Sequence, residues 1–265
     1  MKRKAESEDD PSAGASEPQL PSSLKLYYFN IKGKGEPIRL ICSYSGLKLD
    51  DHRFASRDEF IALKESSILP FGQVPMLEVK YGGSLENNTK KTDDEESSTS
   101  ANHHHKIVQS ATIMRFLGKI TGLYPTTLSE DELMLATKID ALLDQETDAF
   151  TGVTVLTYSQ RFGLDLTDEQ KDSSYELVNT ETLPKHLWNV EKVLSMSKSG
   201  WLADTAEPSI CDFVWACRLQ SLASKKELST KIQNLEDFPN LKAFVDKFFD
   251  LKQIKDYYEK EAGNA

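Results

Sequence analysis

A change of hydrophobic periodicity near residue 129 limits the fold of this 265-residue chain more than any other feature. Beyond that point apolar residues recur only at helical spacing. The expected helices there are 130–162, 168–197, 209–224, 239–249 and a short tail helix. Before that point the apolar runs are short and are bounded by glycine and proline. We therefore expect an all-helical domain at 130–260 that follows a smaller mixed domain at 24–122.

The mixed part alternates between short strands and helices. Residues 24–29 (Leu-Lys-Leu-Tyr-Tyr-Phe) are typical of a buried strand, and Pro37 suits the first turn of a helix that Gly46 ends. The other expected elements are strands at 52–54, 74–79 and 107–108 and helices at 57–64 and 110–120. The order strand, helix, strand, helix, strand, strand, helix predicts an α/β thioredoxin-like N-terminal domain.

Two segments are expected to lie outside the folded body. Residues 1–23 have the composition of a disordered tail, although the basic triplet at 2–4 leaves a nuclear signal open. Residues 81–105 form an acidic, low-complexity insertion between two strands, and a long hairpin tip of this kind is tolerated. Its three histidines could bind a metal ion, but neighbouring loop histidines have no preformed geometry. We expect no metal site.

Charge and cysteine usage exclude several classes of protein. The net charge of −10 argues against binding nucleic acid through phosphate contacts, and half of it lies in the two segments just described. No apolar run is long enough to span a membrane, and the first residues lack the apolar stretch of a secretory signal. Cys42, Cys211 and Cys217 form no CxxC pair and are expected to be buried, inert thiols. We expect a cytoplasmic protein without nucleic-acid or membrane partners.

Four motifs, in order along the chain, resemble the glutathione transferase family and most closely its Sigma class, which includes prostaglandin D synthase. The resemblance covers residues 24–260 apart from the insertion. Its motifs are Leu-Tyr-Tyr-Phe-Asn at 26–30 with Gly-Glu-Pro-Ile-Arg at 35–39, Leu-Pro-Phe-Gly-Gln-Val-Pro at 69–75, Gln-Ser at 109–110, and Trp-Leu-Ala at 201–203 with Pro-Ser-Ile-Cys-Asp-Phe at 208–213. It implies that glutathione is the co-substrate and that no further cofactor is needed.

The chemistry of that family requires an ionised thiol. A reference thiol with a pKa of about 8.5 is only about 3% ionised at pH 7, and lowering the pKa by about two units requires roughly 2.7 kcal/mol of preferential stabilisation. A tyrosine hydroxyl that donates to the sulfur can supply much of this. Tyr27 and Tyr28 point to opposite faces of a strand, so one of them belongs to the core. The residues alone leave the choice open, and the resemblance implies that Tyr28 is the donor.

The resemblance also implies the residues that bind glutathione. Gln109 and Ser110 stand where a helix begins, and the free N–H groups there attract a carboxylate. Ser110 could instead be only the helix cap. The bond before Pro75 is expected to be cis, so that Val74 offers its backbone to the cysteinyl part of glutathione. The remaining binding residues implied are Phe29, Lys34, Phe60, Lys64 and Gln73.

Asp140, Asp144 and Asp148 follow one another at a spacing of four on the long helix. Such a stripe is usually a solvated face, and a divalent cation is the weaker alternative. The resemblance implies that Asp148 reaches the amine of glutathione in a neighbouring subunit, and hence a homodimer. It places the pocket for a small hydrophobic electrophile between Lys34 and the inward face of the long helix. We expect this pocket to be lined by Val153, Thr157 and Tyr158 as well as by Lys34.

Three functions remain open at this stage. The chain could be a conjugating transferase or peroxidase, an isomerase of the prostaglandin D synthase kind, or a non-catalytic binding or structural protein. Lys34 stands where the Sigma pattern has arginine, and Phe60 stands where tryptophan is common. The first strand ends without a cysteine, which argues against thiol-transferase chemistry. Tyr28 together with Gln109 and Ser110 favours an enzyme.

Overall fold

A computed structural model describes residues 20–82 and 104–263. Its only sheet within these residues has four strands in the order β2-β1-β3-β4. The strands are β1 (Ser23–Phe29), β2 (Asp50–Phe54), β3 (Met76–Lys80) and β4 (His104–Val108). β1 pairs with β2 in parallel, whereas β3 is antiparallel to both β1 and β4. This mixed sheet confirms the thioredoxin-like prediction.

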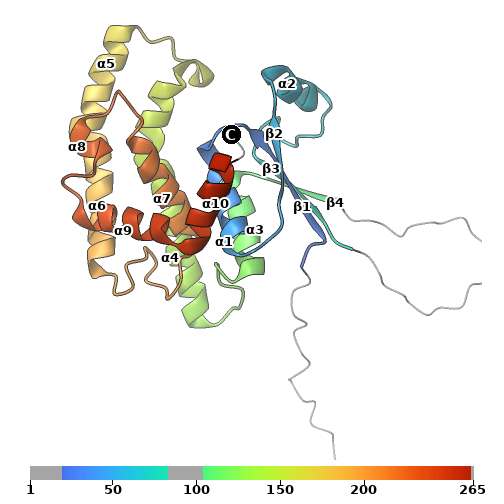
Figure 1. Cartoon of the computed structure of the whole chain (residues 1–265). Helices are drawn as coiled ribbons and strands as arrows, with labels where there is room; N and C mark the ends of the chain where they lie inside the picture. Colours follow the sequence, from blue (N-terminus) through green and yellow to red (C-terminus); the bar gives the residue numbers. More distant parts are fainter. Residues whose placement is uncertain (1–19, 83–103, 264–265) are drawn as a thin grey trace, which may run out of the picture.

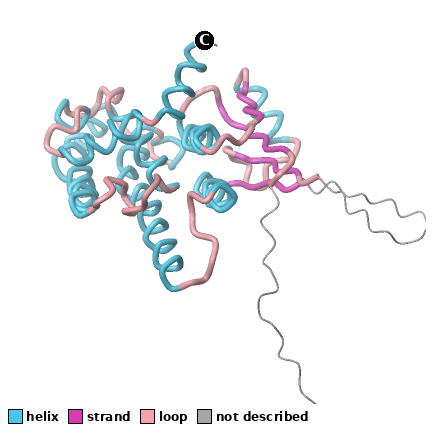
Figure 2. Tube along the Cα trace, turned by 60° about the horizontal axis from the view of Figure 1, so that its bottom comes forward, coloured by secondary structure: helices cyan, strands magenta, loops and turns pink. Residues whose placement is uncertain are grey.

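Three helices accompany the sheet. They are α1 (Glu36–Tyr44), α2 (Arg57–Glu65) and α3 (Ser110–Thr121), and a 3-10 turn (Gly33–Gly35) precedes α1. Figure 1 shows α1 and α3 between the sheet and the later helices, while α2 lies beside β2 at the far edge. The strands gather on one side of the molecule, and most of the helices lie on the other (Figure 2).

All the described elements after α3 are helical, which confirms the second half of the predicted fold. They are α4 (Glu130–Thr157), a 3-10 turn (Ser159–Phe162), α5 (Asp168–Leu177), a π-helical turn (Val178–Thr182), α6 (Leu183–Met196), α7 (Ile210–Leu222), α8 (Thr230–Gln233), α9 (Pro239–Asp250) and α10 (Lys252–Gly263). The helix expected at 130–162 ends five residues early, and that expected at 168–197 contains the π-helical turn.

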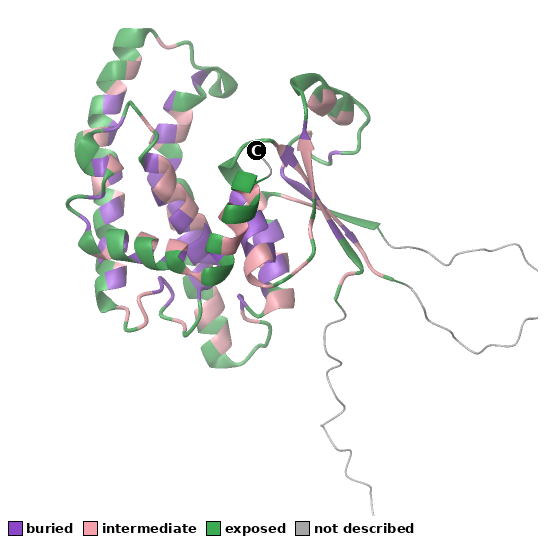
Figure 3. Cartoon of the chain, viewed as in Figure 1, coloured by how far each residue is buried: buried purple, intermediate pink, exposed green. Residues whose placement is uncertain are grey.

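The centre of the helical part is α7, which packs against α1, α4 and α9. Its side chains are mostly buried, as the purple segments of Figure 3 show. Trp215 is fully buried, and its indole N–H donates to the carbonyl of Leu142 at 2.8 Å. At the start of the helix the buried carboxylate of Asp212 accepts hydrogen bonds from the backbone N–H groups of Ser209 and Leu202, both at 2.8 Å. These bonds fix where α7 begins.

The structure corrects three boundaries of the sequence-based prediction. Val74 and Pro75, expected inside a strand, precede β3, and the bond between them is cis as the resemblance implied. His104 and His105 belong to β4 rather than to the insertion. Exposed polar residues of this kind lack the alternation of apolar and polar residues that would have indicated a strand. Ser23 begins β1 rather than ending the tail. Residues 1–19 of the predicted tail and 83–103 of the predicted insertion lie outside the described part.

The three cysteines have the environments expected of structural thiols. Cys42 and Cys211 are buried and Cys217 is half-buried, and all three are free. Burial, with a smaller contribution from Asp51, raises the pKa of Cys42 to about 12, and burial also raises the pKa of Cys211. Thiols held protonated in this way are poor nucleophiles. Among the described residues, no helix combines the length and the apolar character that a membrane span requires.

Candidate active site

The hydroxyl group of Tyr28 lies at the end of β1, beneath the loop that leads into α1. Tyr28 faces the core, and only 7% of its surface is exposed. The backbone N–H of Lys34 donates to its hydroxyl oxygen at 3.0 Å. Within the described part of the chain, no acceptor takes the hydroxyl proton. The oxygen is therefore held by one fixed donor, and its proton remains available for a ligand.

Electrostatics keep that proton on the oxygen. Burial raises the pKa of Tyr28, and the N–H of Lys34 opposes this to a smaller extent. The neighbouring Tyr158 also raises the pKa of Tyr28, whereas the charges of Arg39 and Arg218 lower it. Because the net shift is upward, Tyr28 is protonated at neutral pH. It can donate a hydrogen bond there but cannot act as a base.

Two glycines allow the loop to approach Tyr28 closely. A Cβ atom on Gly33 would lie 2.7 Å from the Tyr28 hydroxyl oxygen, and one on Gly35 would lie 2.5 Å from the ring. Gly33 also has a φ of +42°, which L side chains rarely adopt. The sequence Gly-Lys-Gly thus lets the backbone N–H of Lys34 reach the hydroxyl group.

A buried arginine holds this loop in place. The guanidinium of Arg39, on α1, is bonded to Asp51 of β2 at 2.9 Å and to Glu36 at 3.3 Å. It also donates to the backbone carbonyls of Ile31, at 2.9 Å, and of Phe29, at 3.3 Å. Arg39 and Glu36 are each only 3% exposed. Because this buried guanidinium donates hydrogen bonds to these backbone carbonyls, it fixes the path of the backbone.

One face of α4 provides the opposite wall. Glu146, Phe150 and Val153 are buried on this face, and the exposed Thr157 follows on it one turn later. The Thr157 hydroxyl donates to the carbonyl of Val153 at 2.7 Å. Tyr158 ends the helix, is 54% exposed, and is close enough to affect the pKa of Tyr28. Val153, Thr157 and Tyr158, which the sequence analysis expects to line the second-substrate pocket, therefore lie near one another at the C-terminal end of α4.

The residues expected to bind glutathione lie at two backbone features. The cis bond between Val74 and Pro75 turns the chain just before β3. Gln109, with the unusual φ of +71°, caps α3, and its carbonyl accepts the N–H of Ile113 at 2.9 Å. Ser110 is the first residue of α3 and not its cap. As in any helix, the first N–H groups of α3 have no partner within the helix, so they can bind an anion.

The other predicted binding residues have less uniform surroundings. Phe29 and Phe60 pack against each other with ring centres 5.0 Å apart, in an aromatic cluster between β1 and α2. Lys64 is exposed and lies over Gly72, where an added Cβ would be 3.2 Å from its side chain. Gln73 is exposed in the same loop. Lys64 thus lies beside the loop that contains Gln73 and leads to the cis bond, whereas Phe29 and Phe60 pack in the aromatic cluster.

Comparisons with known proteins agree with this geometry. Residues 159–261 match the sequence profile described as the C-terminal domain of glutathione S-transferase. A glutathione S-transferase of Anopheles gambiae is 29% identical over 236 residues, 89% of this chain and 95% of that protein. A solved structure of a major nematode-specific transferase of C. elegans has a TM-score of 0.67 and 28% identity, and the match covers 89% of this chain and 96% of that one. Over most of its length the chain is thus similar to glutathione S-transferases.

The hematopoietic prostaglandin D synthase of Gallus gallus is also similar to this chain. It is 26% identical over 244 residues, which are 92% of this chain and 98% of that protein. The similarity extends through both the sheet and the helical part.

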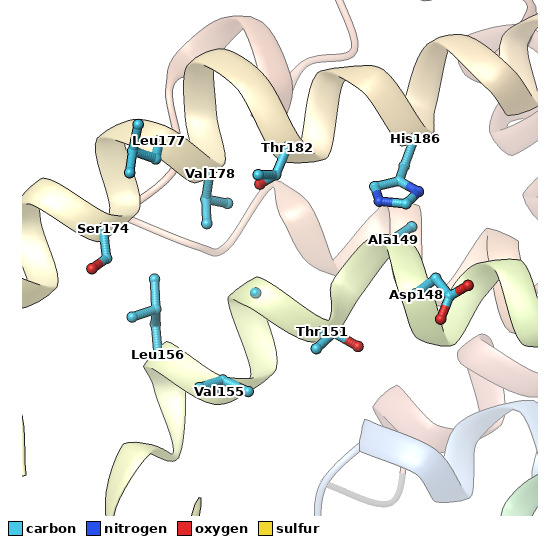
Figure 4. A pocket seen from close by; sticks show the side chains of 11 residues that line it. Asp148, Ala149, Thr151, Val155, Leu156, Ser174, Leu177, Val178, Thr182 and His186 are labelled. Carbon is cyan, nitrogen blue, oxygen red and sulfur yellow. The ribbon is translucent and has the colours of Figure 1, made fainter. Parts of the chain in front are cut away.

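Asp148 is a predicted site residue that lies away from Tyr28. It is exposed on the face of α4 opposite Phe150 and lines a shallow cavity of about 460 Å³ between α4, α5 and α6 (Figure 4). His186 stands at the same end of this cavity. Asp140, from the same stripe, is ion-paired with Arg115 at 2.7 Å. The described residues contain no cluster of three or more His, Cys, Asp or Glu side chains that could hold a metal ion.

Sequence reasoning missed Arg218, a positively charged side chain close to the site. It lies on α7 and is ion-paired with Glu146 of α4. A signal was present, because Arg218 is the only basic residue in a helix that is otherwise mostly apolar. Sequence periodicity assigned that helix to the core and gave no reason to look for a charge at the site.

The close contact at Gly33 makes a prediction about stability. We expect Gly33→Ala to lower the free energy of unfolding by about 2–3 kcal/mol, from backbone strain plus the loss of the hydrogen bond between Lys34 and Tyr28. Gly46→Ala is the matched control, because Gly46 has a φ of +68° but nothing within 4 Å of an added Cβ. It should cost only about 1 kcal/mol. Equal losses in urea unfolding would contradict the close contact.

Proposed function

We propose that this chain is a glutathione transferase in which Tyr28 hydrogen-bonds the sulfur of glutathione and stabilises the thiolate. The thiolate attacks a hydrophobic electrophile, so that a sulfur–carbon bond forms while the leaving group departs with the bonding electrons. The thiol proton is released to water. Peroxides are a second class of substrate that the same thiolate can attack. Glutathione is a co-substrate, and no other cofactor takes part.

The observation that carries this proposal is the unused proton of the Tyr28 hydroxyl. The oxygen accepts a hydrogen bond from the N–H of Lys34, and burial keeps the group protonated. A hydroxyl that already accepts one bond is a stronger donor through its own proton. Lowering the thiol pKa by about two units requires roughly 2.7 kcal/mol, which a buried, charge-assisted hydrogen bond can supply in large part.

The remaining groups suit the other parts of glutathione. The free N–H groups at the start of α3, beside Gln109 and Ser110, fit the γ-glutamyl carboxylate. The backbone of Val74 at the cis bond fits the cysteinyl amide groups. Lys64 and Gln73 fit the glycyl carboxylate. Lys34 keeps the charge of the arginine usual at its position but lacks the planar fork.

The finer assignment is to the Sigma class, with a cytoplasmic location and a homodimer as the working form. The Gallus gallus prostaglandin D synthase, similar over nearly its whole length, supports this class. It also favours isomerase chemistry as the second candidate, in which the same thiolate attacks and is then returned. Product analysis separates the two, because only conjugation consumes glutathione.

Replacing Tyr28 by phenylalanine tests the proposed function. We expect kcat for conjugation to an aromatic electrophile to fall about 10- to 100-fold, because the hydrogen bond to the sulfur is lost, while glutathione binding in calorimetry is largely retained. Tyr27→Phe is the matched control, because Tyr27 lies on the other face of β1 with its hydroxyl directed to Glu78. Equal effects of the two variants on kcat, or no turnover by the wild type, would contradict the proposal.

The homodimer and the role of Asp148 have a joint test. If Asp148 binds glutathione held by the partner, Asp148→Asn should weaken activity severalfold, as expected for a charge-assisted hydrogen bond. Mixing this variant with Tyr28→Phe should then restore activity, because a mixed dimer contains one site with both native residues. Activity that stays at the average of the two variants after subunit exchange would contradict action between subunits.

A further inference from the structure

Arg218 stands on the wall of the site with its orientation fixed by two contacts. Its Nε–H donates to the carboxylate of Glu146, which is only 8% exposed. Its guanidinium lies 5.0 Å from the centre of the Phe150 ring. Glu146 and Phe150 are one turn apart on the face of α4 that continues to Val153. An ion pair and an aromatic ring together hold the plane of the guanidinium.

Most of the hydrogen-bonding capacity of this guanidinium is unused. A guanidinium has five N–H donors, and Glu146 takes the one on Nε. Over residues 20–82 and 104–263, no acceptor pairs with the two terminal nitrogens of Arg218. The side chain is 31% exposed, so these nitrogens are accessible. They form a fork of the kind that binds a carboxylate through two parallel hydrogen bonds.

The fork lies on the side of the site where the electrophile must bind. The charge of Arg218 is close enough to Tyr28 to lower its pKa against the larger effect of burial. Two residues further along α7, Gln220 accepts a bond from Lys32 of the loop above Tyr28, at 3.4 Å. The contacts of Arg218 itself place it against Glu146 and Phe150 on α4, within electrostatic reach of Tyr28.

The surroundings add positive charge. Lys32 and Lys34, in the same loop, are exposed, and Lys34 forms no ion pair with any described residue. Glu146 balances one of the three positive charges. The local excess of positive charge, in a chain of net charge −10, favours a ligand group that carries a negative charge.

We infer that Arg218, supported by Lys34, forms a subsite for a carboxylate, so that this chain selects electrophiles with an apolar body and a carboxylate group. This inference rests on the proposed function and names its substrate class. The alternative is that Arg218 only ties α7 to α4. A structural tie would affect neutral and anionic ligands equally, whereas a carboxylate subsite affects only the anionic ones.

Two conjugates that differ in one group separate these possibilities. S-(4-Carboxybenzyl)glutathione and S-(4-carbamoylbenzyl)glutathione have nearly the same shape, and calorimetry measures their binding to the full chain. We expect the wild type to prefer the carboxyl compound by about tenfold, as for a charge-assisted bond, and Arg218→Gln to abolish that preference while changing carbamoyl binding little. Arg115→Gln is the matched control, because Arg115 is similarly exposed and paired with Asp140. It should leave the preference intact.

The other possible results contradict either the carboxylate subsite alone or the proposed function as well. An equal loss of both conjugates in Arg218→Gln, or no preference in the wild type, would overturn the carboxylate subsite and leave the proposed function standing. Failure of the wild type to bind either conjugate would overturn the proposed function as well. If Arg218→Gln does not fold, Arg218→Lys keeps the charge but loses the fork, and it should lower the preference severalfold. An unchanged preference in that variant would overturn the two-pronged contact.

Discussion

The buried guanidinium of Arg39 is the interaction on which the rest of the site depends. Burying a charge is costly unless its donors are satisfied, and here they are divided between the carboxylates of Glu36 and Asp51 and two carbonyls of the β1–α1 loop. The loop therefore has one well-defined path over β1. That path brings the N–H of Lys34 to 3.0 Å from the Tyr28 hydroxyl, and the glycines on either side of Lys34 leave room for it. The orientation of the tyrosine proton follows from this chain of contacts.

The site is also a meeting point of the two parts of the fold. β1 and its loop supply Tyr28 and Lys34, while α4 and α7 supply Tyr158 and Arg218. One continuous core, from Leu24 to Ile254, joins the sheet to these helices. The tyrosine proposed to activate the thiol and the helices proposed to select the electrophile are thus positioned by the same core. Change in the helical wall can alter specificity without disturbing the tyrosine.

Much of this fold could be predicted from the sequence, because periodicity records burial. The strand around Tyr28 and most of the helices after residue 129 were predicted with small errors at their ends, because their buried residues recur at regular spacing. The exposed outer residues of β4 bury no face and so gave no signal, and the four residues of α8 are too short for a period to register. The cis bond before Pro75 came from resemblance, since X-Pro sequences alone are mostly trans.

The site residues that belong to a local sequence motif could be predicted, whereas those brought to the site only by tertiary packing could not. Tyr28 and Gln109 lie in recognisable local patterns. Sequence could show that Tyr27 and Tyr28 face opposite ways, but the burial of Tyr28 beneath the loop is a tertiary contact. Arg218 meets Glu146 across 72 positions of sequence, so no local pattern announces their pairing.

The pKa of glutathione bound to the wild-type chain tests the central claim most directly. The thiolate absorbs in the ultraviolet, so a pH titration of the complex against free glutathione gives the ionisation of the bound thiol. The account predicts a midpoint about two units below that of the free thiol, because the Tyr28 proton favours the charged sulfur. A midpoint equal to or above that of free glutathione would contradict it.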